Sequence, residues 1–331
     1  MTARGRTWGL ALLAGAAAFA LWWRLFNGPR VASLALSADP GLVFGAVALM
    51  GAAQVLRLLR WHALLNRLAR VPLGRTFRLL YASEFLNTVL PVKVGDVGRA
   101  LALAARSPGF TVGSATASMV VDRLWGIAAR LLALTLLLAV PSNLPASLRA
   151  SAGIFAAVLV GAVAAVLVWR RYDAALARAG APLLRFLPAG ARDAAGRTLR
   201  AFADASVEVG VRPSLAAGLF ALSAASLAAQ SAGLALLFRA AGHPVPLAVA
   251  VVGTALLDLL AVVPAPPAGV GTTEWYATLI FATGLGQPVE ATAAAALLYH
   301  AAWLLIVFVA GAASLAAVGE MLPRRAPGAA A

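Results

Sequence analysis

The sequence predicts an all-α polytopic membrane protein, on the evidence of its composition, its long apolar stretches and the positions of its arginines. Of the 331 residues, 62% are hydrophobic and only 12% are charged, with a mean hydropathy of +0.88. A soluble domain is about half apolar and about a quarter charged. Too few polar residues remain here to cover a water-facing surface. We therefore predict a single integral membrane domain over residues 1–331.

Six stretches are apolar and near the length that crosses a bilayer, which takes about 20 residues. The first begins with a basic segment, as a signal peptide does, but Leu21-Trp22-Trp23-Arg24 stands where a small-residue cleavage site would follow, so we expect a retained helix. The six expected transmembrane helices cover about residues 7–26, 41–59, 112–140, 151–169, 214–238 and 292–318.

Two further apolar segments, about 77–105 and about 247–285, are interrupted in the middle. Residues 90–96 read Leu-Pro-Val-Lys-Val-Gly-Asp, and residues 264–271 read Pro-Ala-Pro-Pro-Ala-Gly-Val-Gly. Neither half of either segment is long enough to span a membrane. Irregular backbone at membrane depth is tolerated only where protein buries it or water wets it. We therefore predict two re-entrant helical hairpins whose breaks face an interior cavity.

The positive charges orient this arrangement. The net charge of +15 is carried by arginine with a single lysine, and arginines cluster in residues 4–6, 57–78, 170–212 and 324–325. Positive residues favour cytoplasmic loops. All four clusters fall on one side if six helices cross the membrane and both hairpins are re-entrant. We therefore predict a multi-pass protein of the cell inner (cytoplasmic) membrane with both termini in the cytoplasm.

In this topology the hairpins enter from opposite faces, so the two halves form an inverted repeat. The first half-repeat covers about 41–140 and the second about 213–320. The basic segment between them, about 170–212, is interpreted either as a cytoplasmic amphipathic helix on the membrane surface or as a solvated linker. The excess positive charge is expected to contact anionic lipid headgroups, and nucleic acid is not expected as a partner.

Five of the 12 acidic residues lie within or beside apolar segments. A charge inside a bilayer costs roughly 2.5–3.5 kcal/mol on insertion scales, so such residues are expected to face the bundle interior and to form pairs. The acids are Glu84, Asp96, Asp122, Asp258 and Glu274. The cations expected to pair with them are Lys93, Arg99, Arg123 and Arg130.

Each hairpin contains an acid, a proline break, a glycine turn and a second acid at the start of the next helix. In transporters built from inverted repeats, substrate binds near the midplane at such broken helices, and helix N-termini suit phosphate. Asp96 and Glu274 either cap helix amides or bind a cationic headgroup or a proton. Arg99 either binds a lipid phosphate or pairs with an acid. Asn87 either binds substrate or caps the backbone freed by Pro91.

These motifs resemble those of a known family. The run Asn-Thr-Val-Leu-Pro at 87–91, Gly95-Asp96, Arg99 and Asp122-Arg123 are similar to the signature of the lysylphosphatidylglycerol synthase transmembrane (flippase) family, which also includes the UPF0104 and AglD-like membrane proteins. Residues 267–274, Pro-Ala-Gly-Val-Gly-Thr-Thr-Glu, resemble its second motif. The resemblance implies a lipid-flipping function. We expect no soluble catalytic domain in this chain.

The sequence departs from the family pattern at several points. Ala268 stands where the second motif commonly has glycine, and Tyr299-His300 stands where Tyr-Arg is expected. No soluble segment follows Ala331, so the aminoacyl-transferring domain of the synthases is not expected. The candidate residues for substrate binding and transport are Asn87, Pro91, Gly95, Asp96, Arg99, Asp122, Arg123, Gly269, Gly271 and Glu274, with Glu84, Lys93, Asp258, Tyr299 and His300 as secondary candidates.

The favoured function is that of a lipid transporter that moves or binds a polar, phosphate-bearing or anionic lipid headgroup. Two alternatives stay open: a non-catalytic membrane partner of a lipid-modifying enzyme, docking through residues 170–212, and an intramembrane lipid-headgroup transferase. The chain has no cysteine, three scattered histidines and no phosphate-binding loop with a lysine. No cofactor, metal or catalytic residue is therefore expected. The expected partners are membrane lipid, a second copy of the chain and a lipid-modifying enzyme.

Overall fold

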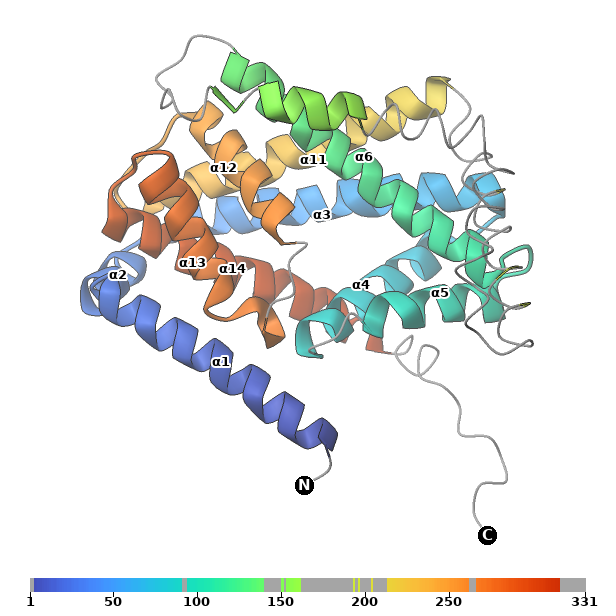
Figure 1. Ribbon diagram of the computed structural model, residues 1–331, viewed down its shortest axis with the longest axis horizontal. Coiled ribbons are helices and arrows are strands. Elements are labelled where there is room, and N and C mark those ends of the chain that lie inside the picture. The colour runs from blue at the N-terminus through green and yellow to red at the C-terminus, as the bar shows by residue number, and fades with distance from the viewer. Residues whose placement is uncertain are drawn as a thin grey trace.

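The described part of the chain is entirely helical (Figure 1). The structure, a computed structural model, describes residues 3–90, 94–139, 150–151, 153–161, 213–261 and 266–315, with the single residues 193, 196 and 204. No strand occurs among these residues, as the predicted all-α fold requires. The predicted linker at 170–212, apart from those single residues, and the predicted site residues Pro91 and Lys93 lie outside the described residues.

The helices fall into two stretches of chain that share an order of elements, except that the first stretch begins with two further helices. The first stretch comprises α1 (Ala3–Leu25), α2 (Gly28–Leu36), α3 (Pro40–Leu68), α4 (Leu73–Val89), α5 (Val94–Arg106) and α6 (Val112–Ala139). The second comprises α11 (Pro213–Ala240), α12 (Leu247–Leu260), the short 3₁₀ turn η1 (Pro267–Gly269), α13 (Thr272–Thr278), the π-helical η2 (Leu279–Gly284) and α14 (Val289–Ala312).

Three described helices are long and apolar enough to cross a membrane, namely α3, α11 and α14. Helix α6 is as long, but it carries Asp122, Arg123 and Arg130. These apolar helices make the chain a multi-pass membrane protein. Only residues 151 and 153–161 of the predicted span at 151–169 are described, so the count of six spans stays a prediction. The other predicted spans fall on α1, α3, α6, α11 and α14.

Helices α3 and α11 pack closely and run in opposite directions (Figure 1). A Cβ atom on Gly233 would stand 3.0 Å from the carbonyl oxygen of Ala46, and the hydroxyl of Ser226 donates to the carbonyl oxygen of Ala53 at 3.0 Å. Small residues allow this approach, as is usual where membrane helices associate. The α3–α11 pair therefore forms the centre of the bundle.

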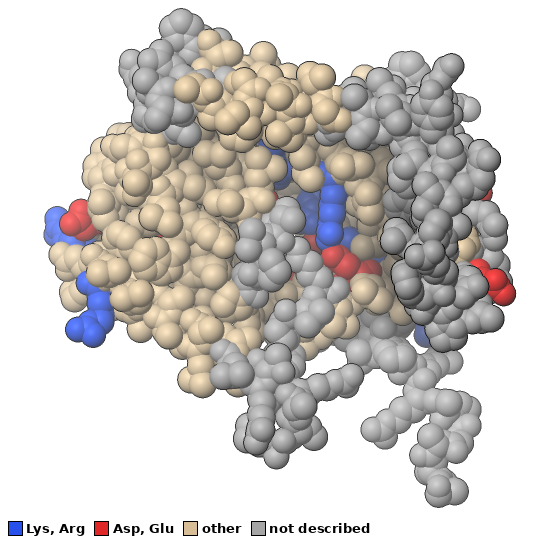
Figure 2. All heavy atoms as spheres, in the orientation of Figure 1, with Lys and Arg blue, Asp and Glu red and all other residues tan. Residues whose placement is uncertain are grey.

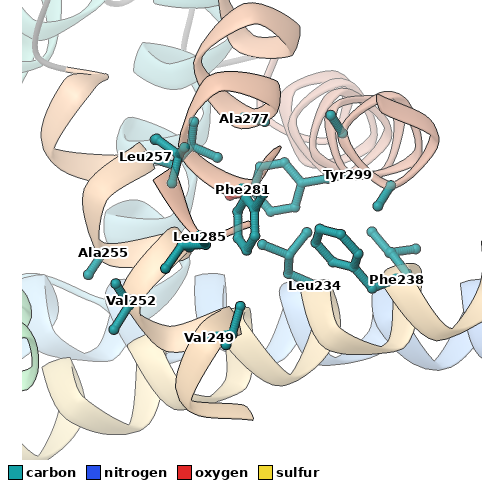
Figure 3. Packing of buried hydrophobic residues seen from close by; sticks show 14 of the residues in the cluster. Leu234, Phe238, Val249, Val252, Ala255, Leu257, Ala277, Phe281, Leu285 and Tyr299 are labelled. Carbon is teal, nitrogen blue, oxygen red and sulfur yellow. The ribbon is translucent and has the colours of Figure 1, made fainter. Parts of the chain in front are cut away.

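The other helices pack across this central pair in a reciprocal way. Helix α6 contacts α12, and α14 contacts α4, so the last helix of each stretch packs on the helix that precedes the interruption in the other. The largest apolar cluster joins α11, α12, α13, η2 and α14, with Phe238 and Phe281 packed ring to ring at 5.0 Å (Figure 3). This packing fixes α12 and the segment that follows its break against α14.

Candidate functional site

Helices α4 and α5 pack side by side and bring Asp96 beneath α4. The carboxylate oxygen Oδ1 of Asp96 accepts hydrogen bonds from Asn87 Nδ2 at 3.2 Å and from Ser83 Oγ at 3.3 Å, both on α4. It also accepts from Arg99 Nη2 at 3.2 Å. The other oxygen, Oδ2, accepts from the guanidinium of Arg123 on α6. One carboxylate thus receives four donors from three helices.

Arg99 is buried in this arrangement. Its guanidinium lies over the indole of Trp61 on α3, 4.6 Å from the ring centroid, a cation–π geometry. The indole is held in turn by a hydrogen bond from Trp61 Nε1 to Ser118 Oγ at 3.2 Å. Arg99 Nε and Asn87 Oδ1 are buried and have no hydrogen-bond partner. Two polar atoms beside Asp96 therefore keep unused hydrogen-bonding capacity.

Two arginines of α3 complete the surroundings of Asp96. Arg60 Nε and Nη2 bond the two oxygens of Asp122 at 2.7 and 3.1 Å, and Arg60 Nη1 donates to Ser223 Oγ on α11 at 2.9 Å. Arg57 forms an ion pair with Glu84 on α4. The assignment of both arginines to a cytoplasmic loop cluster was wrong, because α3 continues to Leu68 and turns these side chains toward acids inside the bundle.

A separate polar contact joins α6, α11, α12 and α14. Arg130 Nε and Nη2 donate to Asp258 Oδ2 at 2.8 and 2.5 Å. Gln230 Nε2 lies 3.1 Å from Asp258 Oδ1 and 2.7 Å from the hydroxyl of Tyr299. Asp258 is thereby neutralised, and the polar groups of four helices satisfy one another away from Asp96.

The second interrupted segment is built around Glu274 and His300, which are both buried. Glu274 Oε2 accepts from the backbone N–H of Gly271 at 2.9 Å, and Glu274 Oε1 lies 2.6 Å from His300 Nδ1. His300 Nε2 lies 2.7 Å from the carbonyl oxygen of Ala268. The backbone of the turn is left-handed at Ala268, Gly269 and Gly271, with φ of 58°, 71° and 82°.

Among the residues that the structure describes, the arginines inside the bundle outnumber the carboxylates with which they pair. Five arginines pair with four carboxylates, because Arg99 and Arg123 share Asp96 while the other three arginines each have their own acid. The described cluster therefore carries one positive charge in excess. The side chain of Arg123 is 50% exposed. Figure 2 shows arginine or lysine atoms and acidic atoms together inside a hollow near the middle of the face shown.

The predicted site residues thus fall into three groups. Asn87, Gly95, Asp96, Arg99 and Arg123 come together, with Glu84 and Asp122 beside them. Gly269, Gly271, Glu274 and His300 form the second group, and Asp258 and Tyr299 belong to the third.

Arg57, Arg60 and Gln230 were not predicted as site residues. Each is a charged or amide residue within, or at the end of, an apolar helical stretch, and that position could have identified it. Arg57 and Arg60 are spaced by three residues with Leu58 and Trp61 beside them, which places both arginines on a helix that is still partly apolar. Gln230 stands within the apolar stretch 214–238.

These features define a polytopic helical membrane protein whose ionised side chains are paired inside the bundle around two interrupted helices. The chain belongs to the family of the lysylphosphatidylglycerol synthase TM region, whose family model matches residues 7–311. This match confirms the resemblance inferred from the motifs. Neither the curated proteins nor the solved structures include a match to this chain.

Proposed function

We propose that this protein binds the polar headgroup of a phosphate-bearing or anionic lipid at Asp96, Arg99 and Arg123 and moves it between the leaflets. The observation that carries the proposal is that two guanidinium groups share one carboxylate. An arriving phosphate would neutralise the excess positive charge, and the planar guanidinium fork suits phosphate oxygens. The half-exposed Arg123 is the most accessible of the three groups to an arriving headgroup.

The unpaired polar atoms beside Asp96 support the same proposal. Buried donors and acceptors normally find partners, and each exception calls for an explanation. Arg99 Nε offers a donor and Asn87 Oδ1 an acceptor. A phosphodiester headgroup with hydroxyl groups has both acceptors and donors. Such a headgroup would accept from Arg99 Nε and donate to Asn87 Oδ1 at the same time.

The transport mechanism that we propose rests on an inverted repeat of two half-helix pairs. Corresponding residues support it, since each stands at the same place in its own helix. Arg57 and Gln230 are each the eighteenth residue of α3 and α11. Glu84 and Asp258 are each the twelfth residue of α4 and α12. The opposite directions of α3 and α11 support opposite orientations of the two repeats, the arrangement in which transporters bind substrate at broken helices.

The chain's place in the cell follows from the same proposal. We place it in the inner membrane with both termini in the cytoplasm, so that the break at 91–93 opens toward the cytoplasm and the turn at 267–271 toward the outside. The natural chain has no cysteine, so single cysteines can be introduced without background. Lys93→Cys should be labelled only from the cytoplasmic side and Val270→Cys only from outside. Labelling of both positions from one side would contradict the inverted arrangement.

Transport is tested in liposomes that contain the purified protein and a trace of fluorescent phosphatidylglycerol. Dithionite added outside bleaches only the outer leaflet, so crossing appears as slow further loss of fluorescence. We expect the protein to accelerate crossing, and Arg123→Gln to slow it severalfold because the excess positive charge is lost. Arg239→Gln is the matched control, since Arg239 is exposed at the end of α11 and contributes to none of the ion pairs described above.

The outcomes separate the proposal from its alternatives. Equal crossing with Arg123→Gln, Asp96→Asn and the parent would show that the site is elsewhere. No crossing above protein-free liposomes would contradict transport of this lipid. Conversion of the lipid, seen by mass spectrometry of the same liposomes, would instead favour a headgroup transferase.

A further inference from the structure

We infer that His300 and Glu274 form a proton-binding site in the second interrupted segment, and that this proton drives or gates lipid movement at Asp96. Proton binding itself is independent of the function proposed above, whereas its coupling to lipid movement rests on that function. The inference depends on three features of the pair: its hydrogen-bond pattern, its isolation from other charges and its correspondence to Arg123 and Asp96.

The hydrogen-bond pattern fixes where protons must lie. The carbonyl oxygen of Ala268 can only accept, so His300 Nε2, 2.7 Å away, carries a hydrogen. His300 Nδ1 and Glu274 Oε1 are 2.6 Å apart. A bare imidazole nitrogen and a bare carboxylate oxygen would both be acceptors, and two acceptors do not approach so closely. A proton therefore lies between them, and the pair is neutral as a whole.

Loss of this proton would leave a buried negative charge facing a lone pair. Glu274 is 2% exposed and His300 is 4% exposed, so water does not compensate. Among the described residues, no arginine or lysine forms an ion pair with Glu274. A neutral pair is therefore compatible with this environment, and a deprotonated pair requires the environment to change.

The charged and titratable groups described on the packed helices do not bond to Glu274 or His300. On α12, Asp258 is paired with Arg130, and on α4, Glu84 is paired with Arg57 of α3. Tyr299, the neighbour on α14, bonds Gln230 of α11. The remaining charged or titratable groups whose side chains the structure describes on these helices are Arg24 of α1, Arg30 of α2, Arg60, His62 and Arg67 of α3, Arg75, Arg78 and Tyr81 of α4, Arg239 of α11, Tyr276 of α13 and Glu290 of α14, and none of them forms a hydrogen bond or ion pair with Glu274 or His300.

The pair stands at the same place in its repeat as Arg123 and Asp96 do in theirs. Asp96 and Glu274 are each the third residue of α5 and α13. Arg123 and His300 are each the twelfth residue of α6 and α14. An arginine stays charged under all ordinary conditions, whereas a histidine is able to exchange a proton. The structure therefore has a permanent cation at one site and a side chain able to exchange a proton at the other.

Release of the proton would act on the backbone of the turn. His300 and Glu274 tie Ala268 and Gly271 to α14, and a Cβ atom on Gly271 would stand 2.8 Å from the carbonyl oxygen of Gly15 on α1. A change at the pair would therefore pass through the turn to α1. This gives the proton a mechanical route from a buried pair to α1.

Proton binding is tested directly by nuclear magnetic resonance of protein labelled with ¹⁵N-histidine in lipid nanodiscs. The spectrum of His300→Arg identifies the signals of His300 among the three histidines. We expect the His300 ring to carry hydrogen on Nε2 throughout and to change its Nδ1 signal as the pH is raised through the range in which the protein stays folded. An Nε2 without hydrogen, or an Nδ1 signal that does not change, would overturn the inference.

Coupling is tested in the fluorescent phosphatidylglycerol liposomes with an imposed pH gradient. The measured quantity is the ratio of crossing rates under gradients of opposite sign. We expect a severalfold ratio for the parent and a ratio of one for His300→Arg and Glu274→Gln, whatever their absolute rates. His243→Gln, which changes a histidine in the loop before α12, should keep the parental ratio.

The two experiments distinguish failure of the proposed transport from failure of the proposed proton site. If no lipid crosses under either gradient, the proposed function fails, and the resonance experiment alone decides whether the pair binds a proton. If lipid crosses but the parental ratio is one, the coupling is refuted although transport stands. If His300→Arg keeps the parental ratio, another group carries the proton.

Discussion

Gly95 lies against the backbone of Ser83, so closely that a Cβ atom on Gly95 would stand 2.1 Å from the carbonyl oxygen of Ser83. The same atom would stand 2.8 Å from Asn87 Oδ1. This approach of α5 to α4 sets the distances at which Ser83 and Asn87 reach Asp96. The glycine thus positions the carboxylate on which two arginines converge, although it has no chemistry of its own.

Gly95→Ala should therefore separate α4 from α5. We expect a loss of ~1–3 kcal/mol in the free energy of unfolding, as for overpacking of a tight contact, and slower lipid crossing. Stability is measured by detergent-induced unfolding followed by circular dichroism. Gly51→Ala in α3, where the added methyl group meets nothing within 4 Å, is the matched control and should leave stability unchanged or raise it. Equal stability of both variants would contradict the close approach.

The ion pair of Arg60 and Asp122 gives a second prediction. Both side chains are buried, so Arg60→Ala leaves Asp122 without its cation. We expect a loss of ~3–5 kcal/mol in unfolding free energy, the cost of an uncompensated buried charge. The double variant Arg60→Met with Asp122→Leu should recover most of it, because both charges are then gone. Arg30→Ala, at an exposed position, serves as the control. A double variant less stable than Arg60→Ala would contradict this explanation.

The sequence predicts the order of the long helices, both interruptions and the pairing of Arg99, Arg123 and Arg130 with acids inside the bundle, because these follow from local pattern and from the cost of charge in a membrane. It does not predict which helices pack together. Arg60 meets Ser223, and Arg130 meets Asp258, across more than a hundred residues of chain. The indole of Trp61 beneath Arg99 depends on the same packing. Partner choice is a property of the assembled bundle, and no period or spacing along one helix encodes it.

Ala268 provides a third prediction. It adopts φ of 58° and ψ of 1°, a left-handed conformation that costs an L-residue roughly 1–2 kcal/mol. Ala268→Gly should relieve this strain. The greater freedom of glycine in the unfolded chain offsets part of the effect, so the expected net gain in unfolding free energy is ~0.5–1 kcal/mol. The carbonyl oxygen that faces His300 is retained. Ala261→Gly, the same change at a right-handed position with φ of −63°, should instead lose stability. If both substitutions changed the stability by the same amount, the backbone at Ala268 would not be strained.

The contact between Gly253 of α12 and Phe281 of η2 gives the last prediction. A Cβ atom on Gly253 would stand 2.0 Å from the ring of Phe281, which is buried in the main apolar cluster (Figure 3). Gly253→Ala should lose ~1–3 kcal/mol of unfolding free energy because the ring has no space to retreat.

A second-site change tests that cause. Phe281→Leu alone should also destabilise, since it leaves space in the cluster. The double variant with Gly253→Ala should lose less unfolding free energy than the two single variants lose together, by ~0.5–3 kcal/mol. Gly218→Ala in α11, where nothing lies within 4 Å, combined with Phe281→Leu should show no such coupling. Additive losses for Gly253→Ala and Phe281→Leu would mean that the two halves of the second interrupted segment do not pack as closely as this contact requires.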